Sequence, residues 1–257
     1  MKQIKYICIA AAALVLSTVA VSASSDIKVS KLMAQKTSEP SEILMNSYRY
    51  MGKLKRFSID AITTNEDMYG DKMLVTYTHH IHMDVIRPNL LHIELNGDIK
   101  NRSYYINDGH FTVYDKNTNY YGTLEVPQKI DHALDHLFEK FNIKTSLANI
   151  LYTDLDKRIP PKTKGYYFGI LDVKDTPCHH IGFVTPTQEF QVWIAVGKHP
   201  VIRRFTVIDK TEILRPRSST VLKWDLKPNL KPNSFVFEKP KGAVQINIEP
   251  AVKQEAK

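Results

Sequence analysis

Cys178 lies beside two histidines in the segment TPCHHIGFV, and this group could support nucleophilic catalysis. A histidine near a cysteine can take the thiol proton and leave a reactive thiolate. In a strand, side chains alternate between faces, so Cys178 and His180 share one face while His179 lies on the other. Catalysis also needs an orienting third group and an oxyanion site, and the sequence shows neither. We therefore interpret Cys178 as a structural thiol beside a hydrogen-bonded histidine.

A second group, in the segment THHIHMD, has residue types that bind zinc. His80, His82 and Asp84 alternate onto one face of a strand, where three or four convergent ligands would suffice for a metal. The spacing matches no recognised metal motif, so we favour a solvated polar face. The opposite face carries the residues Tyr77, Ile81, Met83 and Val85.

The segment HALDH places His132 and His136 four residues apart on a helix, a spacing compatible with metal binding. Ala133 stands where a zinc-protease motif has glutamate, and both histidines lie away from the apolar stripe, which favours a solvated helix face. The sequence contains no GxSxG motif, no phosphate-binding glycine loop and no paired-cysteine motif. We predict no catalytic residue, metal site or cofactor, and a metal-dependent hydrolase that uses the histidines is the weakest alternative.

The N-terminus has the pattern of a secretory signal peptide. Lys2 and Lys5 precede an apolar run over residues 6–21, and small residues then offer a cleavage point near Ala23. An uncleaved membrane anchor is the alternative, but the apolar run is short for a transmembrane helix and no basic residues directly follow it that would stop its transfer across the membrane. We expect residues 1–23 to be removed and the protein to be exported to the periplasm.

The remaining chain divides by composition into three parts. We expect a flexible leader over residues 24–40, a single domain over residues 41–249 and a polar tail over residues 250–257. No internal repeat and no clear linker divides the central part. Only Cys178 remains after cleavage, so no intramolecular disulfide can form and side-chain packing must hold the fold.

The charge of the chain narrows its range of partners. The formal net charge is +8, and removal of two lysines with the signal peptide lowers it to about +6. This mild excess favours an acidic partner or an anionic membrane surface. No dense run of Lys and Arg is present, and export also argues against nucleic acid as a partner.

The hydrophobic periodicity predicts one helix, a first group of strands, more helices and a second group of strands. We expect Ser41 to cap a helix whose apolar stripe includes Leu44, Tyr48 and Met51. Turn signals at Asn96-Gly97 and Asp108-Gly109 indicate hairpins in an antiparallel meander. A helical stripe then follows, with the residues Ile130, Leu134, Leu137, Phe138 and Phe141, and we expect a second short helix to start at Thr145 or Ser146.

Strand patterns resume after the helices and predict the segments GYYFGILDV, PCHHIGFV, EFQVWIAV, VIRRFTVID, SSTVLKWDL and SFVFEK. About ten antiparallel strands with a few helices indicate an α+β protein, with one large curved sheet covered on one face.

Aromatic residues are frequent in both groups of strands, and an ordinary core explains most of them. The more specific hypothesis is that the curved sheet keeps an apolar concavity that binds a lipid-like ligand. The candidate ligand-binding residues are Tyr77, Ile81, Met83, Tyr105, Phe111, Phe138, Phe183, Trp193, Phe205 and Trp224.

Two stretches of the sequence carry a family resemblance. The segments SYYINDGHFTVYDKNTNYYGTLEVP and IDHALDHLFEKFNIKTSLANILYTD, with TPCHHIGFV and EFQVWIAVGKHPVIRRFTV, resemble a family of predicted periplasmic proteins, domain of unknown function 2092. Cys178, His180 and Phe183 fit its pattern, as does Trp193 in the next strand. In the closing stretch SFVFEKPKGAVQINI, Pro240, Gly242 and Ala243 fit a PPxGA-like motif of the family, but Lys241 departs from its second proline. The turn at residues 196–199 lacks the acidic hairpin that we expect of the family.

This family is similar in fold to the LolA, LolB and RseB group, and the resemblance implies an unclosed half β-barrel with helices covering the concave face. It also implies a non-enzymatic protein that carries or senses a lipid or lipoprotein acyl chain in an apolar cavity. The alternative is a periplasmic scaffold or sensor with a closed cavity that binds a membrane or envelope protein.

Overall fold

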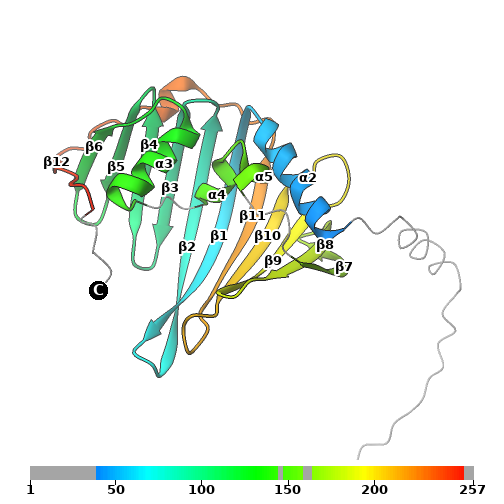
Figure 1. Ribbon diagram of the computed structural model, residues 1–257. Coiled ribbons are helices and arrows are strands. Elements are labelled where there is room, and N and C mark those ends of the chain that lie inside the picture. Colours follow the sequence, from blue (N-terminus) through cyan, green and yellow to red (C-terminus); the bar gives the residue numbers. More distant parts are fainter. Residues whose placement is uncertain (1–38, 144–146, 159–163, 252–257) are drawn as a thin grey trace, which may run out of the picture. The chain divides into compact units, whose positions relative to one another are not determined.

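The computed structural model describes residues 39–143, 147–158 and 164–251. The predicted signal peptide, nearly all of the predicted leader, the predicted start of the second short helix and most of the tail lie outside these residues. Within them, one mostly antiparallel sheet of 12 strands has the order β12-β6-β5-β4-β3-β2-β1-β11-β10-β9-β8-β7 (Figure 1). The sheet is curved and is not closed into a barrel, as predicted.

The first six strands form the predicted meander, in which each strand pairs with the next along the chain. Asp108 and Gly109 turn the β4–β5 hairpin with φ angles of 44° and 87°, which fits the predicted turn. The bounds are β1 (Arg56–Tyr69), β2 (Met73–Ile86), β3 (Leu90–Gly97), β4 (Asn101–Asn107), β5 (His110–Asp115) and β6 (Tyr120–Glu125).

The second group of strands starts at the opposite edge of the sheet and returns to its middle. Each of these strands pairs with the next, and β11 then pairs with β1, so the two groups form one sheet. The bounds are β7 (Gly165–Val173), β8 (Thr176–Val184), β9 (Gln188–Ala195), β10 (Ile202–Asp209) and β11 (Arg217–Asp225).

Helices among the described residues cover one face of the curved sheet, as Figure 1 shows. They are α2 (Pro40–Lys53), α3 (Ile130–Phe141), α4 (Ala148–Leu151) and α5 (Leu155–Arg158). We call the covered face of the sheet the inner face and the opposite one the outer face. No helix among the described residues is long and apolar enough to span a membrane.

Two local predictions were wrong. The first helix begins at Pro40 with Glu39 as its N-cap, so Ser41 lies in the first turn and does not cap it; proline suits this position because it lacks an N–H that would need a partner. The segment SFVFEK is not a strand, because the 3₁₀ helix η1 (Pro232–Phe235) occupies its start.

The C-terminal segment, residues 226–251, joins the sheet at its other edge. Phe235 is fully buried, and the ring of Phe237 contacts the rings of three tyrosines on outer-face positions, Tyr105, Tyr114 and Tyr121. The short strand β12 (Val244–Gln245) then pairs in parallel with β6. This segment therefore protects the edge strand β6, whose N–H and C=O groups would otherwise lack partners.

Candidate ligand-binding interior and its helical cover

Most of the inner face of the sheet is an apolar wall. Strand register places Ile81 opposite Ala61 and Leu95, and the same face continues along each strand with a period of two. The helices contribute Leu44, Leu134 and other apolar side chains to the same cluster. In this structure the helices pack directly on the wall, and its central residues are almost completely buried.

The ten predicted ligand-binding residues do not form a single wall. Tyr105 and Trp193 lie on the outer face, where Tyr105 stacks on His92 at 4.4 Å and Trp193 stacks on His180 at 4.1 Å. Phe138 lies on α3 and is half exposed. Seven of the ten share the inner face, namely Tyr77, Ile81, Met83, Phe111, Phe183, Phe205 and Trp224.

Alternation along strand β9 explains the placement of Trp193. Val192 and Ile194 point into the main core, so Trp193 between them must point outward. There it packs with Val173 and Cys178 in a small second cluster, with the guanidinium of Arg204 4.7 Å from its ring centre. The aromatic pattern in the sequence could not reveal this, because core and outer-face aromatics look alike in composition.

The environment of Cys178 fits a structural thiol. Its side chain is fully buried, its thiol donates to the Thr176 carbonyl at 3.3 Å, and burial raises the pKa of Cys178 to about 11. His180 interacts instead with the amide oxygen of Gln191 at 3.0 Å, and burial lowers the pKa of His180. A thiol with a raised pKa beside a histidine engaged elsewhere is a poor nucleophile.

The predicted polar group at His82 is an ion-pair cluster on the outer face. The ring of His82 lies between two carboxylates, with Nδ1 2.7 Å from Asp60 and Nε2 3.3 Å from Asp84. The hydrogen bond to Asp84, with that to Asp60, raises the pKa of His82 to about 9. Both ring nitrogens are engaged, and no group of three or more potential metal ligands occurs among the described residues.

Arg87, just after β2, ties two helices to the sheet. Its side chain is buried, and its guanidinium donates to the Met51, Gly52 and Leu54 carbonyls at 2.7, 3.2 and 2.8 Å, and to the Leu151 carbonyl at 2.7 Å. These carbonyls lie at the C-terminal ends of α2 and α4, where the helix dipoles favour a cation. We call this set of contacts the Arg87 clasp.

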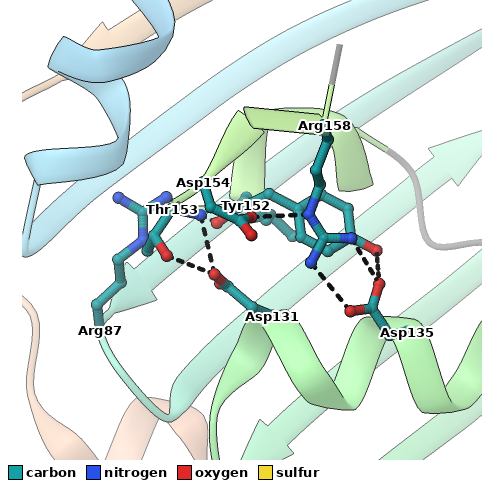
Figure 2. A network of polar contacts seen from close by, with 8 residues as sticks. Arg87, Asp131, Asp135, Tyr152, Thr153, Asp154 and Arg158 are labelled. Carbon is teal, nitrogen blue, oxygen red and sulfur yellow. Dashed lines mark hydrogen bonds and ion pairs between the residues drawn. The ribbon is translucent and has the colours of Figure 1, made fainter. Parts of the chain in front are cut away.

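A second polar group joins α3 to the segment that contains α4 and α5, as Figure 2 shows. Asp135 of α3 accepts two hydrogen bonds from the Arg158 guanidinium at 2.9 and 3.0 Å and one from the Tyr152 hydroxyl at 2.9 Å. Asp131, one turn earlier, accepts a bond from the Thr153 amide at 3.0 Å. The pair Asp135–Arg158 is about one-third exposed, so water screens it and it stabilises the contact only modestly.

Helix α2 has a further contact with the sheet. The Tyr50 hydroxyl lies 2.6 Å from Nδ1 of His199, in the turn between β9 and β10.

Near the start of α2, a surface depression of about 340 Å³ is lined by Ser41, Glu42, Met45, Arg49 and Asp156.

The residues that hold the helices, Arg87, Asp131, Asp135 and Arg158, were not among those predicted from the sequence. One signal was present: Arg87 is a charged residue that directly follows the apolar pair Val85-Ile86 at the end of a long strand and precedes Pro88. Its partners are main-chain carbonyls, which no side-chain motif could have indicated.

The fold and its interior define an open half-barrel whose apolar inner face is covered by helices. Residues 41–249 match the family described as "Predicted periplasmic protein (DUF2092)", and the chain belongs to this family. No curated protein matches the sequence.

Several solved structures are similar at low identity. An uncharacterized conserved protein from Thermus thermophilus is 9% identical, with a TM-score of 0.46 over 79% of this chain and 97% of that one. The lipoprotein LppX from Mycobacterium tuberculosis is 11% identical, with a TM-score of 0.43 over 75% and 98%. A LolA superfamily protein from Nitrosomonas europaea is 7% identical, with a TM-score of 0.37 over 78% and 99%.

Proposed function

We propose that this protein is an exported, non-enzymatic periplasmic protein that binds a lipid or a lipoprotein acyl chain between the inner face and the helices. The observation that carries the proposal is the construction of the interior. An apolar wall formed by many strands is covered by short helices, and the Arg87 clasp holds two of their ends. Displacement of the helices would expose the wall.

Binding would come from burial of the chain methylenes, at about 0.8 kcal/mol for each CH₂. A chain of about 14 carbons would retain several kcal/mol after the loss of its freedom on binding. We further propose that residues 1–23 are removed on export, which fits the periplasmic description of the family. The partners would then be the lipid cargo and a membrane or envelope protein that supplies or receives it.

Uptake of the apolar dye 1-N-phenylnaphthylamine by the folded protein tests this proposal. We expect saturable binding with a stoichiometry near one, and displacement of the dye by myristate or a myristoyl lipid. A dye that shows no saturable fluorescence change with the folded protein would contradict acyl-chain binding.

A second candidate function is a scaffold or sensor that binds a protein partner and keeps its interior closed. The packing of the helices on the wall supports it, since Met83 and Phe111 are each 0% exposed. Exclusion of the dye from the folded protein would favour this candidate.

A further inference from the structure

One row of inner-face residues carries hydrogen-bonding groups instead of apolar side chains. Strand register places His79 of β2 between Gly97 of β3 and Thr63 of β1, and Thr63 lies opposite Thr220 of β11. The adjacent row on the same face is apolar and consists of Leu95, Ile81, Ala61 and Leu222. Across β3, β2, β1 and β11 the inner face therefore changes from apolar to polar between two neighbouring rows, and beyond Thr220 the polar row gives way to Phe205 of β10.

The polar row is buried, and it has unused hydrogen-bonding capacity. His79, Thr63 and Thr220 are 7%, 9% and 1% exposed, and Nδ1 of His79 has no hydrogen-bond partner. The two threonine hydroxyls lie 2.9 Å apart, so one donates to the other and the second hydroxyl hydrogen remains available. Buried polar groups without partners are rare in folded proteins, so this one calls for an explanation.

The position of the His79 ring depends on a glycine. A Cβ atom added at Gly97 would lie 2.4 Å from Cδ2 of His79, so only glycine leaves room for the ring at this place. His79 therefore occupies a fitted position beside its neighbour strand, and it keeps one ring nitrogen free on a face that is otherwise closely packed.

We propose that His79, Thr63 and Thr220 form a site for the uncharged, hydrogen-bonding head of an acyl-chain ligand, such as an ester, amide or hydroxyl group. This inference rests on the proposed function, because the chain of the same ligand would lie along the apolar rows beside it. The site specifies the chemistry of the ligand's polar end.

The charges around the row favour an uncharged head. The inner-face cation near Leu95 is Arg102, and Asp115 already neutralises it at 2.8 Å. On the other side of the row, Ser218 donates to the side-chain oxygen of Asn65 at 2.6 Å, so the neighbours are also neutral. An ionised head would lose its hydration without gaining an unpaired opposite charge.

Ligand binding by a pair of adjacent histidine variants tests the site. His79→Leu removes the inner-face imidazole, and His80→Leu removes its exposed neighbour on the outer face as a matched control. The probes are 1-monomyristoylglycerol, whose head has ester and hydroxyl groups, and 1-N-phenylnaphthylamine, which has neither a carbonyl nor a hydroxyl group. We expect H79L to bind the glyceride about tenfold more weakly than wild type and the dye with an affinity within about twofold of wild type. H80L should bind both probes with wild-type affinity.

A double variant keeps the test valid if His79→Leu fails to fold. Thr63→Val with Thr220→Val removes both partners of one hydrogen bond and retains the side-chain shape, so stability should change little. We expect this variant to bind the glyceride several-fold more weakly and the dye normally. Wild-type affinity for the glyceride in folded H79L, or in the double variant, would overturn the head-group site alone. Failure of the wild-type protein to bind either probe would overturn both the site and the proposed function.

Discussion

Arg87 is the residue on which the attachment of the helices depends most. Its replacement by methionine would keep a similar side-chain length and leave the Met51, Leu54 and Leu151 carbonyls without their donor. Loss of these buried bonds should lower the free energy of unfolding by about 3 kcal/mol, as measured by urea denaturation. Entry of the apolar dye should become faster, because the ends of α2 and α4 would open more often.

Arg56→Met is the matched control for this prediction. Arg56 is exposed and donates a single bond to the Leu230 carbonyl at 3.3 Å, so its loss should lower the free energy of unfolding by less than about 1 kcal/mol. Equal effects of the two substitutions on stability and on dye entry would show that the Arg87 clasp does not hold the helices.

His82 should make stability depend on pH in the alkaline range. Its folded-state pKa of about 9 lies above the ordinary value of 6.5, because Asp84 and Asp60 favour the protonated ring. The stabilisation is therefore complete below pH 6.5 and is lost as pH rises through about 9. Below pH 6.5, wild type should be more stable than His82→Gln by less than about 1 kcal/mol, because the ring is 46% exposed and water screens its ion pairs. This difference should shrink as pH rises through about 9. A difference that is constant with pH would contradict this assignment.

At the scale of the elements, we expect the C-terminal segment to stabilise the fold through Phe235. This residue of η1 is completely buried, so Phe235→Ala should lower the free energy of unfolding by about 3 kcal/mol in urea denaturation. The adjacent Val236 is 50% exposed, and Val236→Ala should change it by less than about 0.5 kcal/mol. Similar effects for both variants would mean that η1 does not anchor this segment.

The predictability of an element depended on whether its pattern was local. The meander and the helices α2 and α3 were predicted because alternation, turn residues and helical spacing can be recognised within a few residues. The segment SFVFEK was predicted wrongly as a strand, because its alternation of aromatic residues resembles strand patterning while Pro232 and long-range packing of Phe235 set its conformation. The alternation of faces was correct for Cys178 and His180, but which face is covered by helices is a property of the complete sheet.

For the whole molecule, the sequence patterns predicted the α+β class and one large curved sheet covered on one face, and the family resemblance added that the sheet is an unclosed half-barrel with helices on its concave face. The sequence did not predict that β11 returns to pair with β1 in the middle of the sheet, because this pairing joins segments far apart along the chain. The same limit applies to the candidate interior. Trp193 was assigned to the wall from composition, whereas the row of His79, Thr63 and Thr220 becomes visible only when the strand register is known.

Native mass spectrometry of the mature protein, isolated from the periplasm without detergent, tests the central claim most directly. We expect a second species heavier than the bare chain by the mass of a lipid, and recovery of that lipid after solvent extraction. The same spectrum would show whether residues 1–23 have been removed. A bare mass alone, unchanged after incubation of the protein with myristoyl lipids, would contradict acyl-chain binding.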